Sequence, residues 1–260
     1  MKPGVRRSSF TPLLSLAFFL IGWHFLATYL VAELPTPLDT TQTFLLLVTR
    51  GEPVLGRTLQ AHTFASLTRV LVGAGIGFSL AIPLGILMGR SGHWERFLSP
   101  MVEILRPIAP LAWIPLAFVL FRDLANTRIL VQMLIIFVGS FFPGLLNTIH
   151  GVKSIDSIYY DVAGTHRASR SQILLKVTLP AALPSIVTGV RIGLGVGWMC
   201  VVAAEMIGGS ASGVGFFLWS MYSIGGGTAK IIAGMIAVGI VGYLLNEGII
   251  FLSARYMRWL

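Results

Sequence analysis

Few side chains in this sequence could do chemistry, and three of them belong to one long apolar segment, 184–208. These are Arg191, Trp198 and Glu205. A charge at membrane depth is costly, so it marks a functional candidate. Two interpretations of Glu205 are open: a gate or orienting residue at the outer mouth of a solute pathway, or a structural acid bonded to the amides of the Gly208-Gly209 turn. Arg191 either attracts an anion or extends toward headgroups, and Trp198 either lines the pathway or packs between helices.

Three other charged residues have simpler interpretations. Arg69 is expected near the end of an apolar segment, as an anchor or as the partner of another charge. Glu103 and Arg106 stand three residues apart, which places them on one face of a helix. We therefore expect these two to pair locally.

The sequence lacks the residues that most catalytic mechanisms need. No Gly-x-x-x-x-Gly-Lys-Ser/Thr loop occurs, so the chain has no such loop for the phosphates of ATP. No nucleophile motif, no paired carboxylates and no cluster of His, Cys, Asp and Glu with metal-ligand spacing is present. Cys200 is the only cysteine, which excludes an intramolecular disulfide. We expect no catalytic residue, metal site or cofactor in this chain, and a partner that supplies energy.

The composition places the elements that carry these residues in a lipid bilayer. The chain is 55% hydrophobic and only 11% charged, whereas soluble domains carry about 25% charged residues. Apolar runs of about 20 residues, the length that crosses hydrocarbon, recur at six places: roughly 12–31, 65–89, 104–121, 128–149, 184–208 and 229–252. Pro107, Pro110 and Pro115 interrupt the third run, so a count of five spans stays open beside six.

The distribution of positive charge predicts the orientation of these spans. The net charge is +9, and its lysines and arginines gather before the first span, in the second and fourth connections and after the last span: Lys2, Arg6, Arg7, Arg90, Arg96, Lys153, Arg167, Arg170, Lys176, Arg255 and Arg258. Lysine and arginine mark the cytoplasmic side. Both termini are therefore expected in the cytoplasm, which favours six spans, and the bilayer rather than nucleic acid is the expected partner.

Glycines recur four residues apart within the predicted spans. Gly189, Gly193 and Gly197 form one such series, and Gly73 with Gly77 and Gly85 with Gly89 form two more. Small residues at this spacing let helix backbones approach closely in lipid. We expect them to serve packing within one chain, with a dimer interface as the alternative.

A polar segment, about 152–182, separates the fourth and fifth spans. Apolar residues recur at helical spacing in 155–166, and Ser169 with Gln172 forms a capping-box pair that begins a second helix. Pro180 is expected to end that helix, and Pro184 to begin the next span. The sequence thus predicts a helix–turn–helix on the cytoplasmic face, which either docks a partner or rests on lipid headgroups.

This segment resembles the cytoplasmic coupling loop of ABC importer permeases, which reads Glu-Ala-Ala, three residues, Gly, nine residues, then Ile-x-Leu-Pro. Asp161-Val162-Ala163 stands at the first element and Val177-Thr178-Leu179-Pro180 at the last, while Arg167 occupies the usual glycine. The resemblance implies that the loop inserts into a groove of an ATPase subunit. The residues that it assigns to coupling are Asp161, Val162, Ala163, Arg167, Ala168, Ser169, Val177, Leu179 and Pro180.

Motifs elsewhere resemble the nitrate, sulfonate, taurine and bicarbonate branch of these permeases over nearly the whole chain. They include Leu34-Pro35-Thr36-Pro37, the run from Leu105 to Leu116, Phe141-Phe142-Pro143, Leu183 to Arg191, and Gly213-Val214-Gly215. One region departs from the branch. The stretch from Phe121 to Asn126 stands where a Phe-Gly-x-Gly turn is usual.

The resemblance implies an all-α polytopic bundle like that of type I ABC importers, a single permease domain over 1–260 in a bacterial-type inner membrane. Its implied partners are two ATPase subunits, which would bind ATP and Mg, a second permease copy in a homodimer and an external solute-binding protein. The implied activity is import of a small anion by alternating access. The alternative is a secondary transporter or channel, which would show several inward-facing ionisable residues and an internal repeat.

Overall fold

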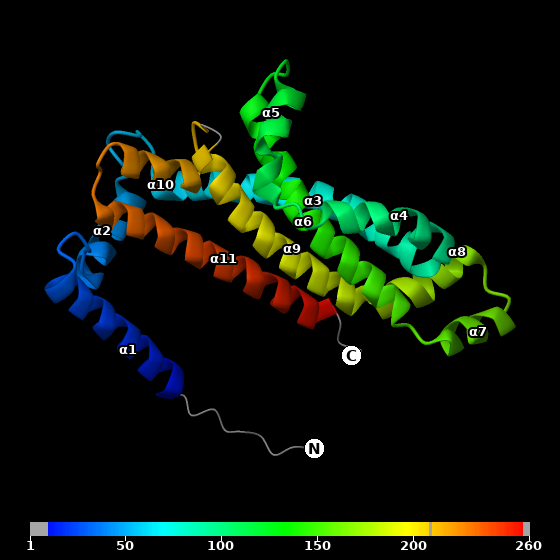
Figure 1. Cartoon of the computed structure of the whole chain (residues 1–260). Coiled ribbons are helices and arrows are strands. Elements are labelled where there is room, and N and C mark those ends of the chain that lie inside the picture. Colours follow the sequence, from blue (N-terminus) through cyan, green and yellow to red (C-terminus); the bar gives the residue numbers. More distant parts are fainter. Residues whose placement is uncertain (1–9, 208–209, 257–260) are drawn as a thin grey trace. The chain divides into compact units, whose positions relative to one another are not determined.

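The computed structural model describes residues 10–207 and 210–256, and all of its named elements are helices (Figure 1). The predicted all-α fold class is therefore confirmed. Two groups of residues named above lie outside the described ranges: the basic positions Lys2, Arg6, Arg7 and Arg258, and the Gly208-Gly209 turn.

In chain order the helices are α1 (Phe10–Phe25), η1 (Leu26–Leu30), α2 (Pro37–Thr49), α3 (Leu59–Arg90), α4 (Gly92–Leu105), η2 (Pro110–Trp113), α5 (Ile114–Phe121), α6 (Thr127–Lys153), α7 (Ser157–Thr165), α8 (Arg170–Ile173), η3 (Leu174–Thr178), α9 (Leu179–Ile207), α10 (Val214–Ser223) and α11 (Thr228–Tyr256). They belong to two compact units: Met1–Gln60 with Phe217–Ala237, and Ala61–Phe216 with Val238–Leu260. A single domain over 1–260 stays a prediction.

Five helical segments within the described residues are long and apolar enough to cross a bilayer: Pro12–Leu30, Leu59–Arg90, Thr127–Lys153, Arg170–Ile207 and Thr228–Arg255. The third predicted span, 104–121, which prolines were expected to interrupt, is not one continuous helix. Instead α4 ends at Leu105, and the η2–α5 pair leaves it at an angle of 89°. Pro107 and Pro110 explain the break, because proline lacks an N–H and restricts the residue before it. A sixth crossing requires this bent pair to count as one span.

Helix α6 lies against α3 along a stripe of small residues in the second unit. A Cβ atom added at Gly73 would lie 3.0 Å from Ile136, and one at Gly85 would lie 2.6 Å from the Cβ of Thr148. Gly77 and Gly89 repeat this approach against Ser140 and Val152. The two helices therefore approach closely at these four glycines, where a side chain on α3 would not fit.

Helix α9 meets α6 through a second set of small residues. A Cβ at Gly189 would lie 3.0 Å from the carbonyl oxygen of Pro143, and one at Gly193 would lie 2.8 Å from that of Ser140. On the α6 side, Gly151 faces Ser185 of α9. The glycine series predicted to pack helices within the chain does so, with α6 in contact with both α3 and α9.

A buried ion pair joins the far ends of α3 and α9. Glu205 is 1% exposed, and Nη1 of Arg69 lies 2.5 Å from its Oε1. The Ser66 hydroxyl and the backbone N–H of Gly215 donate to Oε2 of Glu205 at 2.8 and 2.9 Å. Arg69 also donates to the backbone oxygen of Ser212 at 2.9 Å. The Glu205 carboxylate and the Arg69 guanidinium therefore both have further hydrogen-bond partners besides each other. A buried ion pair is tolerated under this condition.

The backbone that encloses Glu205 requires glycine. Gly213 adopts a φ of 123°, and a Cβ there would overlap the Glu205 carboxylate. A Cβ at Gly215 would overlap the carbonyl of Val202. The Gly213-Val214-Gly215 motif thus has a steric cause: it lets the chain close over the carboxylate.

The glycine contacts predict a difference between two substitutions on the same helix. Gly85→Ala adds a Cβ into the α3–α6 contact, so α3 and α6 must separate, and overpacking of this kind costs about 1–3 kcal/mol. Gly75→Ala is the matched control, because nothing lies within 4 Å of its Cβ position and alanine favours the helix. Thermal unfolding can be monitored by the reaction of the buried Cys200 thiol with a dye. The midpoint temperature of unfolding should fall for Gly85→Ala and not for Gly75→Ala. Equal midpoints for the two variants would contradict the packing.

Removal of one member of the buried ion pair should destabilise the protein more than removal of both. Glu205→Ala leaves Arg69 buried without its carboxylate, which should cost about 3–5 kcal/mol, while Arg69→Met/Glu205→Met should recover part of that loss. Asp123→Ala is the control, because the Arg122–Asp123 pair has side chains 73% and 83% exposed and should shift stability by less than about 0.5 kcal/mol. The same unfolding assay measures all three. A Glu205→Ala midpoint as high as that of the control would show that the pair does not hold α3 to α9.

Candidate functional site

The predicted coupling segment begins with a short helix that exposes an apolar face. Asp156 caps α7, since its carboxylate accepts the backbone N–H of Ile158 at 3.0 Å. Ile158, Tyr159 and Val162 are 57%, 61% and 53% exposed, and the Asp161 side chain is exposed beside them. An exposed apolar cluster with a neighbouring charge has the composition of a contact surface.

A Schellman turn ends α7, and Arg167 occupies its left-handed position. The N–H of Ala168 donates to the carbonyl of Ala163 at 3.0 Å, and that of Arg167 donates to Gly164 at 2.9 Å. Arg167 has a φ of 51°. In this motif the left-handed residue is usually glycine, which is the residue that the resemblance places here. The chain therefore keeps the glycine geometry with an arginine, at a cost of about 1–2 kcal/mol.

The second predicted helix of the segment begins as expected and does not end where expected. Ser169 and Gln172 form the capping box at the start of α8. Pro180 does not stop the helix and Pro184 does not begin the next one; both lie within one continuous segment, Arg170–Ile207. At Pro180 the cause is the π-helical turn η3, in which the N–H of Leu179 bonds to the carbonyl of Leu174. That wider turn leaves room for a proline ring just after it.

The segment is held against the ends of α3 and α9. The Tyr160 hydroxyl of α7 lies 3.5 Å from that of Thr178, which is fully buried. The guanidinium of Arg90, the last residue of α3, lies 5.8 Å from the centre of the Tyr160 ring, within the range of a cation–π contact. At the same end, Lys153 of α6 pairs with Glu95 of α4. α7 is therefore connected to the bundle through its inner face.

The nine predicted coupling residues divide by exposure. Asp161, Val162, Arg167 and Ser169 are exposed, and Ala163, Ala168, Val177, Leu179 and Pro180 are partly buried. The exposed residues are available to a partner. The others support the Schellman turn and the start of α9. Their part in coupling stays a prediction.

The three predicted pathway residues do not form one site. They lie seven residues apart on α9, about 10 Å between successive positions, and each has a different partner. The Nε of Arg191 donates to Oδ1 of Asn246 at 2.6 Å, and the buried indole of Trp198 donates to the carbonyl of Val238 at 3.0 Å. Glu205 binds Arg69, and the backbone amide that it accepts belongs to Gly215. Their roles as pathway residues stay predictions.

Sequence reasoning missed the pairing of Arg69 with Glu205 and misplaced Arg106. The two members of the ion pair are 136 residues apart, so no local spacing signals their contact. Arg106 does not form the expected ion pair with Glu103 among the described residues. It lines a cavity instead.

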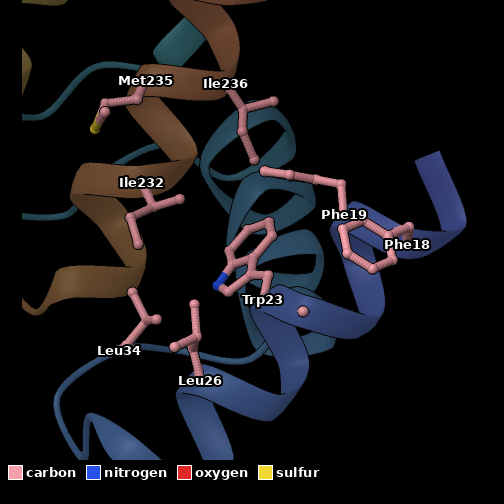
Figure 2. A pocket seen from close by; sticks show the side chains of 9 residues that line it. Phe18, Phe19, Trp23, Leu26, Leu34, Ile232, Met235 and Ile236 are labelled. Atoms are coloured by element: carbon pink, nitrogen blue, oxygen red, sulfur yellow. The ribbon is translucent and has the colours of Figure 1, made fainter. Parts of the chain in front are cut away.

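Two other cavities differ in chemistry. One of about 640 Å³ lies within the first unit, and Figure 2 shows its lining by aromatic and aliphatic side chains such as Phe19, Trp23 and Met235. No charged side chain lines it, so it offers nothing to an ion. The other, about 390 Å³, lies beside the buried ion pair and is lined by Arg69, Arg128 and Ser212 among others. Glu205 itself does not line it.

Comparison with known proteins identifies relatives over nearly the full length. The family model described as "binding-protein-dependent transport system inner membrane component" matches residues 81–257. The bicarbonate transport system permease protein CmpB of Synechococcus elongatus is 38% identical, over 95% of this chain and 89% of that protein. The nitrate import permease protein NrtB of Synechocystis sp. is 37% identical, over 94% and 87%. The taurine transport system permease protein TauC of Escherichia coli is 36% identical, over 94% and 88%.

The fold has a solved counterpart. An inward-facing structure of the MetNI methionine ABC transporter superposes with a TM-score of 0.63, over 76% of this chain and 95% of that chain, at 21% identity. The fold is therefore that of a type I importer permease, as predicted. The family is non-catalytic, and ATP hydrolysis belongs to a separate subunit. We conclude that the chain belongs to the binding-protein-dependent transport system inner membrane component family, the multi-pass permease subunits of ABC importers.

Proposed function

We propose that this chain forms the membrane pathway of an importer for a small oxyanion, of the nitrate, bicarbonate or sulfonate class, taurine included. The names of the relatives support this class, because they are described as bicarbonate, nitrate and taurine transport permeases. The structural observation that carries the proposal is the exposed α7 surface, joined to a membrane-length helix that begins at Arg170. Such a surface can bind a water-soluble ATPase subunit whose movement drives the membrane helices.

The partners follow from the family and from the charge distribution. We propose two copies of this chain with two ATPase subunits, which bind ATP and Mg, and an external protein that delivers the solute. The family description includes a binding protein. The lysines and arginines near α7 support a cytoplasmic position for that end of the bundle. We propose that both termini lie on the same side.

The proposed coupling runs through rigid contacts. Closure of the ATPase subunits moves α7, and the contact of Tyr160 with Thr178 transmits that movement to the start of α9. The continuous segment Arg170–Ile207 is 38 residues, about 57 Å long at 1.5 Å per residue. At its far end, Glu205 connects the movement to α3 through Arg69. A tilt of α9 then changes which side of the pathway is open.

A secondary transporter or channel, the alternative drawn from the sequence, would work without these partners. Proteoliposomes that contain the permease without its ATPase subunits separate the two. Accumulation of nitrate, bicarbonate or taurine in those vesicles would overturn the proposal. Accumulation that requires ATPase subunits and ATP supports it.

Charge reversal on the exposed α7 surface should uncouple the subunit without unfolding it. Asp161→Lys removes the acidic group that faces the partner, and we expect loss of ATPase co-purification or at least a tenfold fall in solute-stimulated hydrolysis. Asp123→Lys makes the same charge change at the exposed end of α5 and should leave both unchanged. Pull-down and phosphate release in nanodiscs measure the effect. Wild-type coupling in Asp161→Lys would remove α7 from the proposed interface.

Arg167→Gly separates the effect of this residue on the turn from its effect on ATPase binding. Arg167→Gly relieves the strain of φ 51° and should stabilise the turn by about 0.5–1 kcal/mol, because glycine tolerates this conformation. Hydrogen exchange of the peptide 163–169 should slow accordingly. If Arg167 also touches the ATPase subunit, the more stable variant binds that subunit more weakly. Faster exchange in the glycine variant would contradict the strain.

A further inference from the structure

A cavity of about 580 Å³ surrounds the break between α4 and η2 in the second unit. Its walls include Arg106 and Pro107 at the break, Phe142 and Asn147 of α6, and Ile192 of α9. A volume of this size and a mainly apolar lining with few polar groups are typical of small-molecule sites.

The cavity lies at the middle of the two helices that form its walls. Its α6 residues run from Val138 to Asn147, on either side of Ser140, the central residue of the 27-residue α6. Its α9 residues, Ile192 and Val196, flank Gly193, the centre of the 29-residue α9. Helices that cross the bilayer have their centres near its midplane. The cavity is therefore far from both surfaces of the membrane.

Both polar side chains of the cavity, Arg106 and Asn147, carry hydrogen-bond donors. The guanidinium of Arg106 makes no hydrogen bond or ion pair with any residue that the structure describes. Asn147 uses one N–H of its Nδ2 on the carbonyl of Pro143, at 2.9 Å, which leaves the second N–H of that amide. No carboxylate lines the cavity. Oxyanions accept hydrogen bonds from a guanidinium, often two in parallel.

The other membrane-depth arginines of the described chain are already engaged. Arg69 binds Glu205, and Arg191 binds Asn246. Arg106 also lines a cavity, but it differs from both because no described residue binds its guanidinium. An uncompensated charge at this depth is costly, and a passing anion would offset that cost.

We propose that the broken helix forms an anion subsite halfway along the pathway, in which Arg106 and Asn147 hold the oxygens of a nitrate, bicarbonate or sulfonate group. The proposal rests on the proposed function, since it assigns a place in the pathway to the same class of solute. The apolar remainder of the wall keeps the hold weak, so that the anion can leave again.

Charge-selective labelling of a cysteine in the cavity wall tests the subsite. The full-length chain, assembled with its ATPase subunits in nanodiscs, carries Cys200→Ala and the reporter Ile192→Cys. The measured quantity is the ratio of its reaction rates with two methanethiosulfonates, an anionic sulfonatoethyl reagent and a cationic trimethylammonioethyl reagent. We expect Arg106→Gln to lower this ratio by about tenfold or more and Arg106→Lys to preserve it.

Protection by small anions gives the second readout. Nitrate, bicarbonate and taurine should slow labelling of Ile192→Cys in a saturable way, and Arg106→Gln should abolish that protection. Leu175→Cys, on the exposed side of η3, is the control position and should show no protection. If Arg106→Gln fails to assemble, Asn147→Asp places a negative charge in the same cavity and should remove protection instead.

The outcomes separate this proposal from the one before it. An unchanged reagent ratio in Arg106→Gln, or labelling that none of the three anions slows, overturns the subsite even when the ATPase subunits remain coupled. An assembly whose ATPase subunits do not respond to solute overturns the proposed function, whatever the labelling shows.

Discussion

The structure depends on the close approach of α6 to two other helices. Side chains at Gly85 or Gly193 would meet backbone carbonyls of α6 at 3.0 Å or less, so these contacts exist only because the side chains are absent. In lipid no hydrophobic force draws helices together, and close backbone packing takes its place. The exposed α7 surface, the buried ion pair and the cavity at the break all use α3, α6 or α9 as their support. Small residues on these helices therefore determine where the candidate sites lie.

Much of this architecture was predictable from local patterns. Composition and the recurrence of 20-residue apolar runs predicted the helical membrane class, and four-residue glycine spacing predicted the packing. The Ser169–Gln172 pair predicted the start of α8. The two non-glycine residues with positive φ among the described residues are Asn126 and Arg167. Both stand where the family resemblance expects glycine-containing turns. The structure keeps a left-handed residue in each turn, which the residue types Asn and Arg did not predict.

The parts that sequence reasoning missed are those that depend on distant or non-standard contacts. Pro180 would end a regular helix, but the π-helical turn before it removes the clash, and no propensity rule predicts that turn. Arg69 and Glu205 meet across 136 residues, and only the folded bundle brings them together. The prolines at 107–115 signalled the break in this span, but local rules give neither the size of the bend, 89°, nor the cavity beside it.

The unbroken segment from Arg170 to Ile207 has a mechanical consequence. A rod about 57 Å long that pivots at its centre by about 10° displaces each tip by about 5 Å, in opposite directions. Its centre, near Thr188 and Gly189, lies against Pro143, Gly144 and Asn147 of α6. One short stroke at the tip near Arg170 would thus give an opposite stroke of similar length at the tip near Ile207.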